Sequence, residues 1–162
     1  MFAKTQFQTL FAYHWHTNNR LLETAVQLND ADLYDENEYG HGGIFDLFLH
    51  LYQTDSGWRI GLETKQQTVV PGQEAYPDLD ALQTAFAEEE AAWAAYLDGL
   101  SAAEIEASIE LTSLRNTKLA LPQWRILQHV LFHGMQHHTE LAQLLTEKGH
   151  SPGDIDFLFF PG

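Results

Sequence analysis

Four histidines of this 162-residue chain have a spacing that could hold a metal ion. His129, His133 and His137 follow one another at intervals of four residues, and His50 lies far upstream. Residues four apart on a helix lie on one face, so neighbouring imidazoles can coordinate the same ion. Each step of four residues drifts by about 40° around the helix, so two of the three converge more readily than all three. The spacing alone leaves open whether the pair is His129 with His133 or His133 with His137.

His50 adds a candidate ligand from another part of the chain. It lies between Leu49 and Leu51, which predicts a largely buried position. A buried imidazole needs a partner for each ring nitrogen, and a metal ion supplies one. The alternative is that the histidines line a polar seam and donate hydrogen bonds. The glutamate of the zinc-protease motif HExxH is missing, since position 134 is Gly, which argues against a protease of that type.

The composition excludes several classes of partner. The chain has 8 basic and 23 acidic residues, a formal charge of −15. Nucleic acids and anionic membranes are bound by clustered Lys and Arg, so neither is an expected partner. There is no cysteine, so metal ligands must be His, Asp, Glu or water, and any reacting thiol must come from a substrate. Neither a signal peptide nor a run of about 20 apolar residues is visible, so we expect a cytoplasmic protein.

Hydrophobic periodicity predicts four long helices that would position the histidines. They cover approximately residues 5–28, 43–63, 79–97 and 122–148. His50 falls in the second helix, and the histidine run falls in the fourth. The expected fold class is therefore all-α, a four-helix bundle with long crossover connections, in a single domain over residues 1–162.

Local signals predict how the connections are built. Asp78 is placed to cap the third helix, and Gly149 to end the fourth. The run Ser101–Glu104 fits a capping box that opens a short helix. Residues 107–121 alternate loosely, which predicts a short extended excursion before the last helix. Residues 65–78 carry two prolines and form a linker.

Three further segments carry expectations of their own. The acidic run Glu88–Glu90 is expected to be a solvated helix face. The apolar tail, residues 154–161, is expected to pack on the bundle, with a dimer contact or a lid as alternatives. His41, His138 and His150 are expected to be structural or exposed.

The chain resembles the DinB-like family of metal-binding four-helix bundles over nearly its whole length. The matching segments are Tyr13–Trp15 with Asn18 or Asn19, Gly43–His50, Leu127–His137, Glu140–Leu145 and Gly149–Asp156. The resemblance implies that His50, His133 and His137 bind a divalent metal and that His129 is a neighbour rather than a ligand. The arginine that often follows the last ligand in the family is His138 here.

The resemblance also implies a chemistry. Three neutral imidazoles leave coordination positions open, as in catalytic sites. Zinc or nickel is the expected ion, and iron or manganese also suits imidazole. Relatives transfer low-molecular-weight thiols, such as bacillithiol or mycothiol, to electrophiles, so a small-molecule thiol is the expected substrate. Candidates to bind its carboxylates are Arg20, Arg59, Arg115, Lys118 and Arg125. A homodimer is expected as well.

Two alternatives to thiol transfer remain at this point. One is a metal-dependent hydrolase, with Asp46, Asp55 or Glu140 as its acid or base. The other is a non-catalytic, stress-associated metal-binding bundle. Asp46 lies one turn before His50, so it is also a candidate to orient that imidazole.

Overall fold

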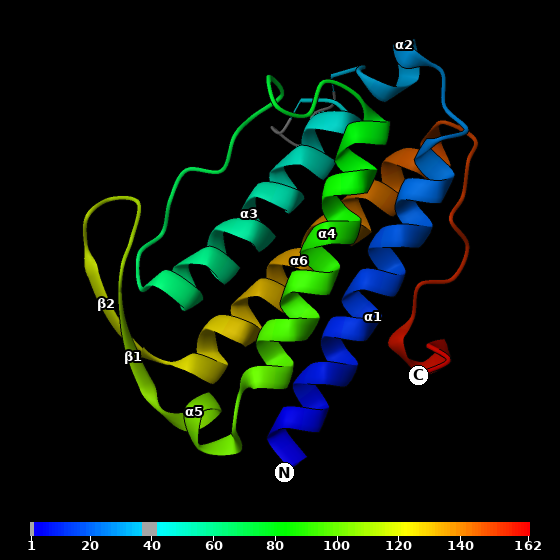
Figure 1. Cartoon of the computed structure of the whole chain (residues 1–162). Coiled ribbons are helices and arrows are strands. Elements are labelled where there is room, and N and C mark those ends of the chain that lie inside the picture. Colours follow the sequence, from blue (N-terminus) through cyan, green and yellow to red (C-terminus); the bar gives the residue numbers. More distant parts are fainter. Residues whose placement is uncertain (1, 37–41) are drawn as a thin grey trace.

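Four long helices make up most of the computed structural model, which describes residues 2–36 and 42–162. The long helices are α1 (Phe2–Ala25), α3 (Ile44–Thr64), α4 (Leu79–Gly99) and α6 (Gln123–Glu147). The short elements are α2 (Asp30–Leu33), α5 (Ala102–Glu106), β1 (Ser108–Thr112), β2 (Lys118–Pro122) and the 3-10 turn η1 (Phe157–Phe159). The long helices form one bundle (Figure 1), which confirms the expected all-α fold class. His41 lies outside the described residues.

The arrangement of the helices explains the long connection in the middle of the chain. Helix α1 packs against α4 and α6, and α3 packs against the same two helices. Helices α3 and α4 run in the same direction, opposite to α1 and α6 (Figure 1). Residues 65–78 must therefore return along the length of the bundle before α4 begins, which makes this segment a crossover.

Local signals set most helix ends where the sequence predicts them. The Asp78 side chain accepts a hydrogen bond from the Ala81 amide and caps α4. Ser101 and Glu104 form the predicted capping box of α5. Gly149 follows Lys148, the C-cap of α6, and adopts a φ of 86°, which an L side chain rarely adopts. Helix α1 ends at Ala25 rather than at residue 28, because the amides of Gln27 and Leu28 bond to carbonyls three residues back, in turns.

The extended excursion is a two-stranded hairpin between α5 and α6. Strands β1 and β2 pair antiparallel, with Ile109 opposite Leu121 and Leu111 opposite Leu119. The backbone of Thr112 also bonds to Lys65 and Gln67, at 2.9 and 2.8 Å. These bonds fasten the start of the crossover to the hairpin beside α3.

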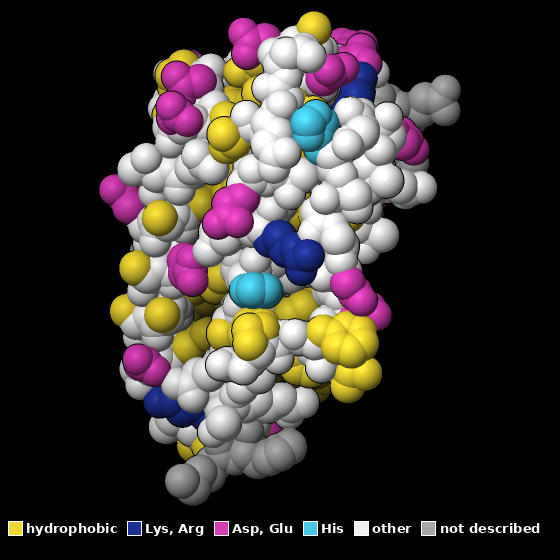
Figure 2. Space-filling view, turned by 90° about the vertical axis from the view of Figure 1, so that its right-hand side faces the viewer, with side chains coloured by type: hydrophobic (Ala, Val, Ile, Leu, Met, Phe, Trp, Pro, Cys, Tyr) yellow, Lys and Arg dark blue, Asp and Glu magenta, His cyan; other side chains and the backbone are white. Residues whose placement is uncertain are grey.

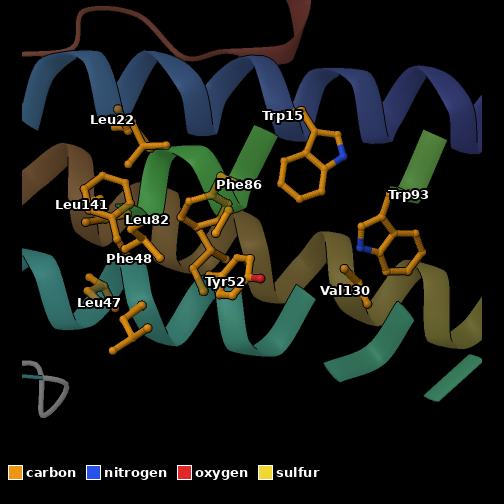
Figure 3. Packing of buried hydrophobic residues seen from close by; sticks show 14 of the residues in the cluster. Trp15, Leu22, Leu47, Phe48, Tyr52, Leu82, Phe86, Trp93, Val130 and Leu141 are labelled. Atoms are coloured by element: carbon orange, nitrogen blue, oxygen red, sulfur yellow. The ribbon is translucent and has the colours of Figure 1, made fainter. Parts of the chain in front are cut away.

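The core lies between the four long helices and is dominated by aromatic and branched side chains (Figure 3). Trp93 is fully buried and stacks on Phe11 with ring centroids 4.5 Å apart. Its indole Nε1 donates to the Asp55 carbonyl oxygen at 3.3 Å, because a buried indole N–H needs an acceptor. Among the described helices, none is long and apolar enough to cross a membrane.

The acidic run on α4 is only partly solvated, so the sequence prediction is wrong for Glu89. This side chain is 4% exposed and accepts hydrogen bonds from Arg59 Nε and Nη2 at 2.6 and 2.7 Å. The carboxylate raises the pKa of the Arg59 guanidinium. Position 89 lies on the same face of α4 as the buried Phe86 and Trp93, which explains why its charge needs a partner.

Replacing Glu89 with Gln is expected to lower the free energy of unfolding by about 2 kcal/mol, because a neutral amide cannot match the charge-assisted bonds to Arg59. Chemical denaturation measures the change. Glu88→Gln, at an exposed position on the same helix, is the matched control and should stay within about 0.5 kcal/mol of the parent. Equal losses in the two variants would contradict the role of Glu89.

The C-terminal tail packs across α1, as the sequence predicts. The Tyr13 hydroxyl donates to the Ile155 carbonyl, and Arg20 Nη1 donates to the Asp154 carbonyl, both at 2.5 Å. The ring of Phe157 meets that of Tyr13 edge-on, with centroids 5.0 Å apart. The dimer contact and the lid expected as alternatives for this tail stay predictions.

Candidate metal centre

Three histidines from two helices converge where α3 packs against α6. His50 comes from α3, and His133 and His137 come from successive turns of α6. The Nε2 atom of His133 lies 3.2 Å from His50 Nε2 and 3.1 Å from His137 Nε2. One ligand atom from each residue lies within 4.8 Å of the others, so this histidine triad could hold a metal ion.

The geometry of the histidine triad fits a divalent ion. Tetrahedral zinc–nitrogen bonds of about 2.0 Å place two ligand nitrogens about 3.3 Å apart, close to the two separations in the triad. The Nε2 atom of His133 is close to two other ring nitrogens. A neutral imidazole has one N–H and one lone pair, so a single proton serves only one of these two contacts. A cation attracts all three lone pairs at once. His50 and His133 are half-buried and His137 is buried, so the cluster also keeps an open side.

Glu140 fixes the ring of His137 in the form that a metal needs. Its Oε2 atom lies 2.5 Å from His137 Nδ1. A carboxylate can only accept, so Nδ1 carries the hydrogen and the lone pair of the neutral ring lies on Nε2, toward His133. The sequence offered Glu140 as an acid or base. The structure instead engages it in orienting a triad histidine.

Replacing Glu140 with Gln is expected to weaken metal binding by about 10-fold, because the neutral carbonyl still accepts from Nδ1 but makes the imidazole less basic. Titration against a competing chelator measures the dissociation constant. Glu147→Gln, an exposed position on the same helix, removes the same charge and should leave the constant unchanged. A similar loss in both variants would mean that Glu140 acts only through its negative charge and not through its bond to His137.

Two residues that the sequence places near the site are outside the triad. His129 is exposed, and its ring lies edge-on to Trp58 with centroids 5.2 Å apart. Asp46 does not orient His50, so that expectation is wrong. Its Oδ2 atom accepts from the Gly43 amide at 2.9 Å and closes the capping box of α3. An acidic residue in the first turn of a helix has free amides within reach, and here it bonds to one of them.

A buried pair of polar side chains next to the triad was missed by sequence reasoning. His14 Nε2 on α1 lies 3.0 Å from Asp55 Oδ2 on α3, and the side chains are 2% and 0% exposed. Burial raises the pKa of the Asp55 carboxyl, and His14 opposes that shift. His14 lies on the apolar face of α1, seven residues after Phe7, which was the available signal. No pattern in the sequence indicates that Asp55 faces it.

Gly134 makes room for this pair. A Cβ atom at position 134 would lie 2.3 Å from His14 Cε1 and 2.4 Å from Nδ1. Real side-chain contacts are never that short. Because Gly134 has no side chain, the His14 ring fits against α6, and α1 can approach α6 at this point.

A hollow of about 250 Å³ lies on the same side of the bundle as the triad. Gln53 and Thr54 line it one turn after His50, and Trp58 lines it beside His129. The crossover and Leu114 at the hairpin complete its walls. Among the described residues that line it, none is charged. This lining suits an uncharged molecule.

The five cations expected to bind a thiol's carboxylates do not gather at this hollow. Arg59 is bonded to Glu89 and Glu63, and Arg20 is bonded to the tail on the other side of the molecule. Arg115, Lys118 and Arg125 are exposed and do not line it. A carboxylate-rich thiol would therefore find few partners there.

The fold and the cluster together define a four-helix bundle with a three-histidine site between two of its helices. A scan against family models matches this chain to the DinB family over residues 1–162. The chain therefore belongs to the DinB family. No curated protein matches it closely enough to count as a relative.

Proposed function

We propose that His50, His133 and His137 hold one divalent metal ion, and that the protein is an enzyme that transfers a low-molecular-weight thiol to an electrophile. The convergence of the three Nε2 atoms carries this proposal. Zinc and nickel are the favoured ions, because imidazole suits both. A bound ion would act as a Lewis acid and lower the pKa of a thiol or a water that coordinates it.

The chain's own residues provide the rest of the site. Glu140 holds His137 with its lone pair toward the centre of the triad. The uncharged hollow beside His50 would receive the body of the substrate, with Gln53 and Thr54 on one wall. Because the chain has no cysteine, the sulfur nucleophile belongs to the substrate. With an aryl halide as electrophile, a carbon–sulfur bond forms, the halide leaves, and the thiol proton passes to solvent.

The uncharged lining of the hollow favours a second candidate, the hydrolysis of a neutral ester or amide. A thiol such as bacillithiol carries carboxylates, and no cationic side chain of the described residues lines the hollow to meet them. Glu140 is engaged with His137, and Asp55 with His14, so neither is poised as a general base in this arrangement. This candidate therefore needs its proton acceptor from solvent.

One experiment separates the two candidates. The zinc- or nickel-loaded protein is incubated with an aryl halide and either a neutral or a carboxylate-bearing thiol, and separately with a neutral aryl ester and no thiol. Thiol transfer predicts metal-dependent conjugation that His133→Ala abolishes, faster with the neutral thiol. Ester cleavage without conjugation would support hydrolysis. If the metal-loaded and metal-free proteins gave equal rates in every arm, the enzymatic proposal would fail in favour of a non-catalytic bundle.

A further inference from the structure

A second hollow lies on the other side of α6 from the histidine triad. It has a volume of about 220 Å³ and is bounded by α1, α6 and η1. Its apolar wall consists of Leu10, Leu131, Phe132, Met135 and Phe157. Consecutive residues of a helix point about 100° apart, so His137 can belong to the triad while His138 lines this second hollow.

The outer rim of this hollow is exposed and apolar. Phe132 is 67% exposed and Phe157 is 48% exposed. Figure 2 shows the face that carries the C-terminal segment, where hydrophobic side chains gather in the lower half around a depression. The bond from Tyr13 to Ile155 holds the tail in place, so that Phe157 forms one wall. The hollow therefore opens to solvent, and the rim of its opening is apolar.

The inner end of the hollow contains an unsatisfied imidazole. His138 is 0% exposed, and neither of its ring nitrogens has a hydrogen-bond partner among the described residues. The adjacent ring of His14, with its centroid 4.8 Å away, directs its Nε2 to Asp55 instead. A buried polar group without a partner is costly, so most such groups in proteins bind a neighbour, water or a ligand.

We propose that this second hollow binds a small uncharged molecule consisting of a single ring with one hydroxyl group, and that His138 recognises the hydroxyl. The volume suits one ring, since a cavity of about 150 Å³ can hold benzene. The described lining carries no Asp, Glu, Lys or Arg, so a charged ligand would lose its hydration without compensation. An imidazole can accept from a hydroxyl or donate to it. Met135 is flexible and can shift to let the hydroxyl reach the ring.

The test uses phenol and toluene, which share a ring and differ in the hydroxyl. Binding to the whole chain is measured by ligand-observed NMR titration. We expect the parent protein to bind phenol about 10-fold more tightly than toluene, which corresponds to one hydrogen bond. His138→Phe keeps an aromatic ring and removes both nitrogens, so it should reduce this ratio to about one. An unchanged ratio in His138→Phe, or no binding of either probe to the parent, would overturn the proposal.

Two further variants locate the binding. Met135→Trp fills the second hollow and should abolish binding of both probes, whereas Leu114→Trp alters the hollow beside the triad and should not. Binding that survives Met135→Trp would place the probes elsewhere and refute the proposal. His133→Ala should bind phenol as the parent does, so failure of the metal proposal and failure of this one give different results.

A spectroscopic measurement keeps the test decisive if His138→Phe does not fold. In the parent protein, phenol should shift the ring nitrogen resonances of His138 and leave those of the exposed His129 unchanged. If a saturating amount of phenol shifted neither set of resonances, phenol would not bond to His138, and the proposed recognition would be contradicted.

Discussion

Replacing His133 with alanine is expected to abolish metal binding. His133 is the central member of the triad, because its Nε2 atom lies within 3.2 Å of the Nε2 atoms of both His50 and His137. Its loss leaves two imidazoles on different helices, which cannot form a chelate through neighbouring turns of one helix. We expect at least a 100-fold weaker dissociation constant, more than the loss of an outer partner of a ligand usually causes.

Two measurements check this result. Elemental analysis after dialysis against zinc or nickel should fall from about one ion per chain to near zero. Thermal unfolding provides an independent readout, because an ion at 100 times its dissociation constant stabilises the folded state by about 2.7 kcal/mol. For a chain of this length that corresponds to an increase in Tm of roughly 5–10 °C in the parent and none in the variant.

His129→Ala is the matched control, since it removes a histidine one turn earlier on the same helix. Its ring centroid is 6.2 Å from that of His133, and its neighbour is Trp58. We expect full metal occupancy in this variant. If His129→Ala lost the ion and His137→Ala retained it, the ligand pair on α6 would be His129 with His133, and the assigned triad would be wrong.

Replacing Gly134 with alanine is expected to destabilise the protein by about 3 kcal/mol. Helix propensity alone predicts the opposite, a gain of about 1 kcal/mol for Gly to Ala inside a helix. The added Cβ would lie 2.3 Å from His14 Cε1, in a position where the ring is 2% exposed. The ring cannot move without breaking its contact with Asp55, and overpacking and loss of a buried pair both carry large costs.

Gly99→Ala separates these opposing effects. Gly99 ends α4, and a Cβ there would meet no atom within 4 Å. We expect this control to be neutral or slightly stabilising in chemical denaturation. A stabilised Gly134→Ala variant would mean that α1 and α6 do not approach each other through the His14 ring.

Much of the fold could be predicted because its signals are local. The capping side chains Asp78 and Ser101 act within three residues of their own position. Periodicity located the long helices because each buries one face. The short helix α2 is not among the predicted elements, since four residues carry too little periodicity to identify a helix.

The errors share a different cause, the position of a residue relative to another helix. Glu89 lies in a run of three acidic residues, and only the packing of α4 on α3 determines which of the three meets Arg59. Asp46 could have oriented His50 or capped its helix, and the chain geometry at Gly43 decides for the cap.

The sequence by itself determined the four-helix bundle, the family, and the residue types that could hold an ion, because periodicity, capping and histidine spacing are properties of neighbouring residues. Only the tertiary structure decided that His50 reaches His133 across 83 positions and that Asp55 faces His14. Likewise, Glu140 fixes the ring of His137, and His138 turns away toward a separate hollow. These contacts depend on how far α1, α3 and α6 are rotated and shifted against one another. The volumes of all the packed side chains determine that arrangement jointly, and the lack of a side chain at Gly134 is one example.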